Sequence, residues 1–147
     1  MNNLHALATW AEPLLQTLTA KERTALLKRL AIALRKRNQQ RIQKQRTPQG
    51  QPFEPRKNTA ARPRALFTQL RKTRHIKTQA TPASATLAII GRAGYIAAIH
   101  QHGRVSHIEH KNGPTTQYPK RELLGFSADD LEFIEQFLIN ALAFPAR

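Results

Sequence analysis

The stretch from Thr19 to Lys44, TAKERTALLKRLAIALRKRNQQRIQK, decides the fold. It opens with a capping box, in which the Thr19 hydroxyl can accept the amide of the third helical residue and the Glu22 side chain can return to the cap amide. The pattern predicts a helix that begins at Ala20 and runs for about 25 residues. One face carries almost only Lys and Arg, so this long basic helix should pack through a single apolar stripe: Leu26, Leu27, Leu30, Ala31 and Leu34.

Helical patterns also stand at both ends of the chain. Apolar residues in 4–18 keep a spacing of three and four, and Pro13 is expected to divide them into two short helical pieces. The segment Ser127 to Asp130 is a helix cap with acids at the positive end of the helix dipole. The helix that follows should stop at Pro145 and bury one stripe: Leu131, Ile134, Phe137, Leu138, Ala141 and Leu142.

A long loop and two candidate hairpins lie between these helices. Residues 47–63 hold four prolines and one glycine without any period, so they should form an extended Pro-rich arm. One or two helical turns are expected at 66–70. The remaining elements are strands at 76–80 and 85–90 joined at Pro82, a short helix over 95–103 that ends at Gly103, and strands at 105–109 and 115–118 joined at Asn112-Gly113.

Positive charge is concentrated in one part of the chain. The formal net charge is +15. Residues 21–77 hold eighteen Lys and Arg against Glu22 and Glu54, a net charge of +16, whereas residues 78–147 balance six bases with six acids. An excess this large indicates an anionic partner, and the composition leaves open an acidic substrate, a nucleic acid, a membrane surface or an acidic protein.

The composition excludes several classes of protein. There is no cysteine, which rules out disulfide scaffolds, thiolate metal sites, iron–sulfur clusters and cysteine nucleophiles. The longest apolar runs, such as Ala93 to Ile99, fall short of the ~18 to 20 residues that span a bilayer. With 147 residues we expect one domain, 1–147, made of a helical basic part at 1–46, the arm at 47–63, and a sheet with a C-terminal helix at 64–147.

Residues capable of catalysis are few. The four histidines between His100 and His110 have spacings that can hold zinc or copper, but only Glu109 lies nearby to complete a ligand set, so surface or hydrogen-bonded histidines are the stronger interpretation. Asp129 and Asp130 are better explained by helix-terminus stabilisation than by an acid pair. No Gly-x-Ser-x-Gly elbow or glycine-rich phosphate loop is present. We therefore expect no enzyme, no cofactor and no metal.

The basic residues between Arg35 and Arg74 could neutralise many phosphates and bind any nucleic acid in a salt-dependent way. No zinc-finger, zipper or clear helix-turn-helix pattern is present, and only Phe53 and Phe67 are available for base stacking. A solvated helix face explains the same charges, and an acidic protein surface would be as good a partner. A small basic nucleic-acid-binding protein therefore stays open as an alternative function.

Five blocks of sequence, in order and across nearly the whole chain, are similar to those of one family. They are TAKER at 19–23, RI at 41–42, QRTPQGQPFEPRK at 45–57, IHQHG at 99–103 and YPKRELLGFS at 118–127. On these blocks the chain resembles the phage virion morphogenesis, or tail completion, proteins of contractile-tailed phages and Mu-like prophages. The resemblance implies an α/β fold of the α+β type, in which a small antiparallel sheet packs against helices, and the elements expected above agree with it.

The resemblance also implies a structural protein without catalytic activity. Such a subunit is added late to a finished tail, caps the tail tube and makes it competent to join the DNA-filled head. The implied partners are further copies of the chain in a ring, tail tube and head-completion or connector proteins, and the DNA that passes through the tail, with no membrane. The implied location is the host cytoplasm during assembly and then the virion tail.

The residues expected at partner or subunit contacts come from the same blocks and from the arm. The arm should order against a neighbouring subunit, because its prolines deny it a strand ladder and its only large apolar anchor is Phe53. Alternation before the last helix should bury Leu124 in the core and leave Arg121 at a subunit or tail contact. The expected contact residues are Arg41, Arg46, Phe53, Arg56, Lys57, Arg62, His100, Gln101, Gly103, Pro119, Arg121 and Gly125.

Overall fold

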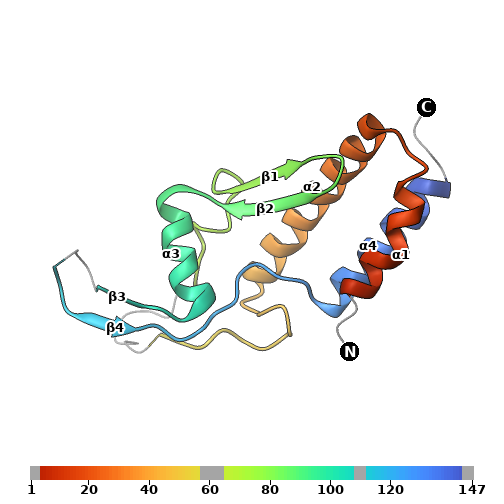
Figure 1. Ribbon diagram of the computed structural model, residues 1–147. Helices are drawn as coiled ribbons and strands as arrows, with labels where there is room; N and C mark the ends of the chain where they lie inside the picture. Colours follow the sequence, from red (N-terminus) through yellow and green to blue (C-terminus); the bar gives the residue numbers. More distant parts are fainter. Residues whose placement is uncertain (1–3, 57–64, 108–111, 144–147) are drawn as a thin grey trace. The chain divides into compact units, whose positions relative to one another are not determined.

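Four helices and two small antiparallel sheets make up residues 4–56, 65–107 and 112–143, the part of the chain that the computed structural model describes (Figure 1). The α+β class expected from the sequence is confirmed. No helix in these three ranges is long and apolar enough to cross a bilayer. In chain order the elements are α1 (Leu4–Leu15), α2 (Ala20–Gln43), β1 (Ile76–Ala80), β2 (Ala85–Ile89), α3 (Gly91–His102), β3 (Val105–His107), β4 (Thr115–Gln117) and α4 (Ala128–Ala143).

The described chain divides into two compact units, whose segments alternate along the sequence. The first unit holds residues 4–37, 78–87 and 126–143. The second holds residues 38–56, 65–77, 88–107 and 112–125. Helix α2 supplies residues 20–37 to the first unit and 38–43 to the second, so neither unit coincides with the parts expected at 1–46, 47–63 and 64–147.

The first unit is built on the apolar stripe of α2. Helices α1 and α4 lie side by side (Figure 1), and both contribute to the core that covers this stripe. Ala80 and Leu87, from the two strands of the first hairpin, pack on the same core. The buried residues of this core are Ala11, Leu26, Leu27, Leu30, Leu34, Ile134 and Leu138.

Pro13 does not divide the first helix, contrary to the expectation from the sequence. Helix α1 runs without a break from Leu4 to Leu15, with Pro13 near its C-terminal end. A proline in that position removes a single backbone hydrogen bond, close to where the helix stops. Leu7 and Leu15, on either side of it, both pack on the core, and this tertiary contact holds the helix in one piece.

Both expected helix caps are formed, each as a capping box. At α2, the Glu22 amide donates to Thr19 Oγ1 at 3.2 Å and the Thr19 amide donates to Glu22 Oε1 at 3.0 Å, which lowers the pKa of the Glu22 carboxyl. At α4, the Asp130 amide donates to Ser127 Oγ and the Ser127 amide donates to Asp130 Oδ2, both at 3.0 Å. Asp130 is buried, and its Oδ1 accepts from Arg37 Nε at 2.6 Å.

The second unit has its own core and contains the second hairpin. The helix expected over 95–103 is confirmed, although α3 begins four residues earlier, and Gly103 ends it in the left-handed conformation with φ +64°. Strands β3 and β4 pair antiparallel with Val105 opposite Gln117, and residues 108–111 between them lie outside the described ranges. The buried core residues are Ile42, Phe53, Leu66, Leu70, Ala93, Ala97 and Leu123.

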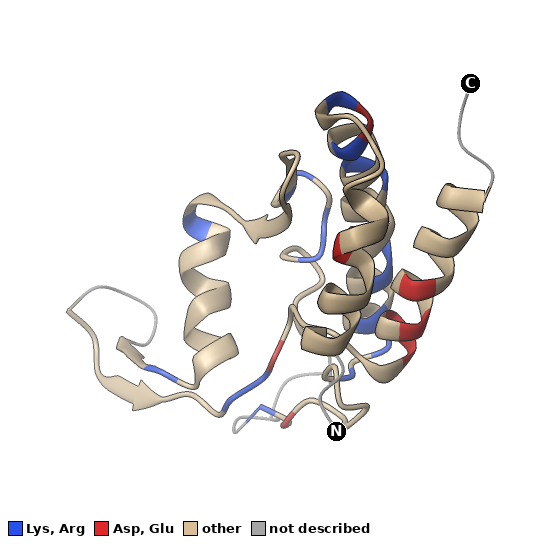
Figure 2. Ribbon diagram, turned by 45° about the vertical axis from the view of Figure 1, so that its right-hand side comes forward, with Lys and Arg blue, Asp and Glu red and all other residues tan. Residues whose placement is uncertain are grey.

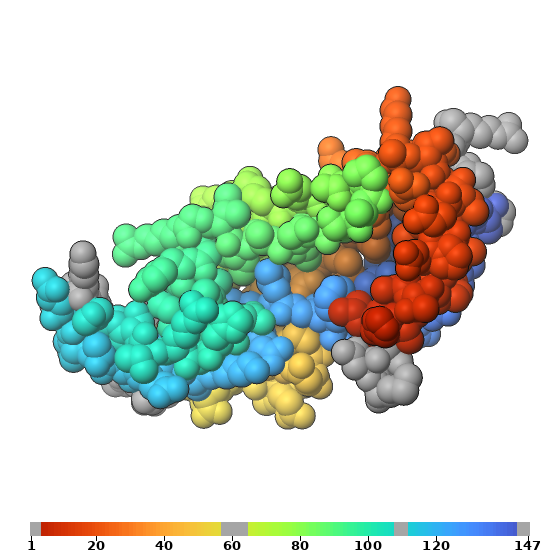
Figure 3. Space-filling model, in the orientation of Figure 1, coloured from red at the N-terminus to blue at the C-terminus, as the bar shows by residue number. Residues whose placement is uncertain are grey.

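The described part of the Pro-rich arm, residues 47–56, packs on its own chain, so the expectation that the arm leaves the core for a neighbour is wrong there. Thr47 donates its amide to Gln51 O at 2.8 Å, and Phe53 donates its amide to Gln45 O at 3.0 Å. Phe53 is only 7% exposed within the core of the second unit. In Figure 3 this yellow segment lies beside the light-blue residues that precede α4. The rest of the arm lies outside the described residues.

Side chains of the segment before α4 alternate between two faces as expected, but the face that is buried is the one expected to point away from the core. Leu123 is 1% exposed and Arg121 is 3% exposed, whereas Leu124 is only partly buried. The expectation of a core Leu124 is therefore wrong, and Arg121 lies on the buried face of the segment, while its expected contact with a subunit or the tail stays a prediction. Arg121 can share the buried face with Leu123 because the surrounding backbone supplies acceptors for its guanidinium.

Candidate functional site

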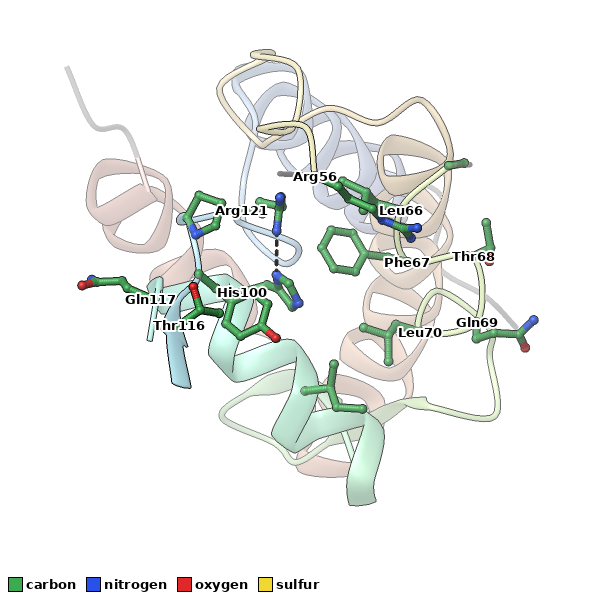
Figure 4. A pocket seen from close by; sticks show the side chains of 14 residues that line it. Arg56, Leu66, Phe67, Thr68, Gln69, Leu70, His100, Thr116, Gln117 and Arg121 are labelled. Atoms are coloured by element: carbon green, nitrogen blue, oxygen red, sulfur yellow. Dashed lines mark hydrogen bonds between the residues drawn. The ribbon is translucent and has the colours of Figure 1, made fainter. Parts of the chain in front are cut away.

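Arg121 is the centre of the site, in the segment between β4 and α4. Its Nε donates to Glu54 O at 2.6 Å and its Nη2 donates to Pro55 O at 3.1 Å. Arg121 therefore holds the described part of the Pro-rich arm against the segment between β4 and α4. Its Nη1 donates to His100 Nδ1 at 3.1 Å (Figure 4), and its amide donates to His100 O at 2.7 Å. An arginine side chain can only donate, so His100 Nδ1 accepts and the ring proton lies on Nε2.

Burial sets the charges of this pair. It lowers the pKa of the Arg121 guanidinium, a shift that nearby Glu54 opposes. Burial also lowers the pKa of His100 to about 4, with the cations Arg121 and Arg56 acting in the same direction. His100 is therefore neutral at pH 7. Within the described ranges no carboxylate forms an ion pair with Arg121, so the centre keeps a positive charge.

A cleft of about 600 Å³ opens beside this pair (Figure 4). Its lining is mostly apolar and contains no acid among the described residues. The two cations of the lining are Arg56 and Arg121. The lining consists of Arg56, Ala65, Leu66, Phe67, Thr68, Gln69, Leu70, Ile96, His100, Thr116, Gln117, Tyr118, Pro119 and Arg121.

A row of four aromatic rings connects the core of the second unit with the cleft. The ring of Phe53 meets that of Phe67 edge to face with 5.3 Å between centroids, and Phe67 meets His100 at 4.9 Å. His100 then meets Tyr118 at 5.1 Å. Edge-to-face contacts of this kind add stability beyond the area they bury, so the rings support one another along the cleft wall.

The backbone at Phe67 is strained, because its φ of +64° is a conformation that a bulky residue rarely adopts. The residue before it is clamped by Gln45, whose side-chain amide accepts from the Leu66 amide at 2.7 Å and donates to Leu66 O at 2.9 Å. Strain of this kind persists only where neighbours over-determine it, and it is concentrated at binding sites. Here it presents the Phe67 ring to the cleft.

Other expected contact residues form the framework behind the cleft. The Gln101 side chain accepts from the amides of Leu123 at 2.8 Å and Leu124 at 3.1 Å and donates to Leu124 O at 3.0 Å. Arg41 Nη2 donates to Gly125 O at 3.1 Å. Gly125 has no room for a side chain, since a Cβ there would lie 2.6 Å from Pro48 Cγ.

The expected residues thus fall into distinct groups. Arg56, His100, Pro119 and Arg121 line the cleft. The framework residues are Arg41, Gln101, Gly125 and Gly103, and the backbone oxygen of Gly103 accepts from Gln117 Nε2 at 3.2 Å. Phe53 is in the core, and Arg46 is exposed and donates to Gly50 O at 3.2 Å. Lys57 and Arg62 lie outside the described residues.

The sequence did not single out Tyr118 or Gln45, and it offered Phe67 only as a base-stacking ring. A signal existed for two of them, because Gln45 and Tyr118 stand inside the blocks that carry the family resemblance. The histidine cluster is not assembled in the described part of the chain: His100 is turned to Arg121, while His102 and His107 are exposed. No group of three or more metal-ligating side chains occurs in those ranges, and His110 lies outside them.

Comparisons with known proteins show the family to which the sequence belongs. The model of the phage virion morphogenesis family matches residues 2–143. The chain is 32% identical over 136 residues to tail completion protein S of Escherichia phage P2, a match that covers 88% of this chain and 90% of that protein. No solved structure matches it significantly. Since the family model spans both units and every block from the α2 cap to the α4 cap, the chain belongs to the phage virion morphogenesis family.

Proposed function

We propose that this chain is a tail completion protein, a structural subunit that caps a finished phage tail tube and makes it competent to join the head. The observation that carries the proposal is the 32% identity to tail completion protein S of phage P2 across 90% of that protein. The role is structural, without catalysis and without a cofactor. The protein acts in the host cytoplasm during assembly and remains in the virion tail.

The cleft beside Arg121 supplies a contact for the tail. An apolar cleft that has two cations and, among the described residues, no acid suits an apolar segment that carries a carboxylate, as on an acidic tail tube or head-completion (connector) protein. The side chain of Arg121 is already held by its own hydrogen bonds, which reduces the cost of ordering it on binding.

Capping follows from the geometry of a ring. Tail tubes grow by stacking rings, so a terminator must match the last ring on one face and offer no docking surface for another on its other face. Copies of this chain would form such a ring around the tail axis, close to the path of the DNA. The short strands β3 and β4 leave edges that can extend a neighbouring sheet through backbone hydrogen bonds.

Deletion of the gene from the phage that carries it tests the function. We expect electron microscopy to show DNA-filled heads and tails that fail to join, and expression of the unaltered chain to restore joined particles. Normal particles without the gene would overturn the proposal.

An exposed arginine of the cleft, Arg56, tests the proposed contact. Arg56→Glu should lower the yield of joined particles, while Arg92→Glu, an equal change at an exposed arginine of α3 outside the cleft, should not. Equal yields for the two variants would remove the cleft from the function and leave tail completion standing.

Nucleic-acid binding is the second candidate, favoured by the run of exposed bases on α2, which includes Lys21, Lys28 and Lys36. A gel shift with random duplex DNA at increasing salt separates the two functions. A tail completion protein should bind weakly, whereas a phosphate-binding protein should bind tightly at low salt and lose affinity steeply as salt rises.

A further inference from the structure

The first unit has a groove between α1 and α4 that its own core does not fill. The groove encloses about 440 Å³, and its lining includes Leu7 and Trp10 of α1 and Leu131 of α4. Trp10 is a large apolar residue that remains 37% exposed. Glu132 and Glu135 stand on the α4 side of the groove, and both are exposed. The feature is an apolar slot with an acidic rim.

Helices α1 and α4 carry acids and no Lys or Arg, although the whole chain has a net charge of +15. The bases of this unit are gathered on α2 instead, and Figure 2 shows blue on α2, with acidic Glu22 in its first turn, and only red among the charged residues of α1 and α4. Such a separation gives one unit two surfaces of opposite potential, which attract each other between molecules.

The outer face of α2 has the complementary pattern. Ile32 is 43% exposed on the side of the helix away from the buried leucine stripe. Lys28 and Lys36, one turn before and one turn after it, are exposed on the same face. A single apolar side chain with a lysine at each end thus matches an apolar slot with two glutamates on its rim.

We propose that the α1–α4 groove of one copy of this chain docks the Lys28–Ile32–Lys36 face of α2 of a second copy. Ile32 enters beside Trp10 and Leu131, and the lysines meet Glu132 and Glu135. The groove and the Lys28–Ile32–Lys36 face both belong to the first unit, and Ile32 lies on the side of α2 opposite the stripe that packs on the core. The groove of one chain therefore cannot receive the Ile32 of the same chain. The contact is heterologous, and its repetition closes a ring or extends a filament. The inference rests on the proposed function for the ring and supplies its contact.

Charge reversal on each surface tests the contact in solution. Sedimentation velocity of the full chain over a concentration series should show self-association that weakens as salt rises. The variant E132K/E135K and the variant K28E/K36E should each weaken self-association by about a hundredfold or more, because each places like charges opposite one another. An equimolar mixture of the two variants should associate again, since each then meets a surface of opposite sign.

Matched controls separate docking from folding. The variant K72E/K77E makes the same change of charge as K28E/K36E, but at exposed lysines of the second unit. It should associate like the unaltered chain. Ile32→Ser should weaken self-association without any change of charge. Circular dichroism spectra of all variants should show the helix content of the unaltered chain, and their melts should stay cooperative, because each altered side chain is exposed or lies on the rim.

Three results would overturn the inference: an unaltered chain that stays monomeric at every concentration, reversed variants that associate normally, or a mixture that stays dissociated. The last would show that the two altered surfaces do not meet each other. Failure of the proposed function would appear separately, as normal phage particles in the absence of the gene, whatever the sedimentation result.

Discussion

Arg121 shows how a buried cation is held mainly by neutral hydrogen-bond acceptors, although the charge of nearby Glu54 also favours its protonated form. Its guanidinium donates to two backbone oxygens and one imidazole, and those groups would lose their partner if the side chain were removed. Arg121→Ala should therefore lower the free energy of unfolding by about 2 to 4 kcal/mol. Arg121→Lys, which keeps the charge but not the planar fork, should lose less. Urea denaturation measures both, and an unchanged midpoint for Arg121→Ala would contradict the hydrogen-bonded arrangement.

His100 makes stability depend on pH in a defined window. As pH falls, the unfolded chain binds a proton at this histidine near pH 6.5, whereas the folded chain resists protonation until about pH 4. The stabilisation is therefore complete above pH 6.5 and is lost as pH falls toward about 4. Allowing for partial exposure of the ring, the loss should be about 1 to 2 kcal/mol.

His100→Gln supplies the comparison, because the glutamine amide can accept a hydrogen bond but does not titrate. Denaturant unfolding of both proteins across this pH range should show a steeper loss for the unaltered chain. Parallel curves would mean that His100 titrates normally in the folded protein.

For individual residues, the sequence predicted that the side chains of 121–125 alternate between two faces, but it did not predict which face is buried. Alternation tells which residues share a face, and it does not tell which face is inside. A leucine normally outranks an arginine for burial, and Leu124 was accordingly assigned to the core. The acceptors that reverse this preference come from Glu54 and Pro55, more than sixty residues earlier in the chain, and from His100. No local pattern could reveal them.

The capping boxes of α2 and α4 can be compared directly, because Glu22 of the first is exposed and Asp130 of the second is buried. Asp130→Asn removes the charge that holds Arg37 at a site 3% exposed, and it should cost about 2 to 4 kcal/mol. Glu22→Gln keeps an acceptor for the Thr19 amide at an exposed site and should leave stability nearly unchanged. Thermal and urea unfolding of the two variants provide the comparison, and equal losses would show that burial of the second box has no energetic weight.

The segment 47–56 should behave as part of the core rather than as a free arm. Phe53→Ala removes a ring that packs against Phe67 and the second core, with an expected cost of about 3 to 5 kcal/mol. Pro52→Ala, at the exposed neighbouring position, should cost far less. Deletion of 49–56 should likewise unfold the second unit. A deleted protein with an unchanged melting curve would restore the idea of an independent arm.

Elements with local signals were predictable and elements held by distant contacts were not. The α2 and α4 caps need only a few consecutive residues, and both formed as expected. The uninterrupted α1 depends on packing against residues of α2 and α4, which the rule for prolines does not include. The site was recovered in part for a similar reason: the family blocks contain Arg121 and His100, but the strain at Phe67 is visible only in the backbone.

On the scale of the whole molecule, the net charge of +15 should make the dilute protein more stable in salt. Repulsion among the bases opposes compaction, and the screening length falls from about 10 Å at 0.1 M salt to about 3 Å at 1 M. The melting temperature should rise by about 2 to 4 °C, equivalent to roughly 1 kcal/mol for a chain of this length. Melts at a concentration below the onset of self-association, in sodium chloride and in an equal concentration of sucrose as an uncharged control, test this. A flat or falling salt series would show that repulsion is unimportant.

The alternation of the two units along the chain has a consequence for inheritance. Any single cut between residues 4 and 143 separates segments that belong to one unit, and a cut within 38–56, 65–107 or 112–125 separates segments of both units. A hybrid gene that joins the front of one relative to the back of another would therefore pair side chains that were never selected together. Such hybrids should fold poorly even between relatives that each fold well, so this gene should pass between phages as an indivisible block.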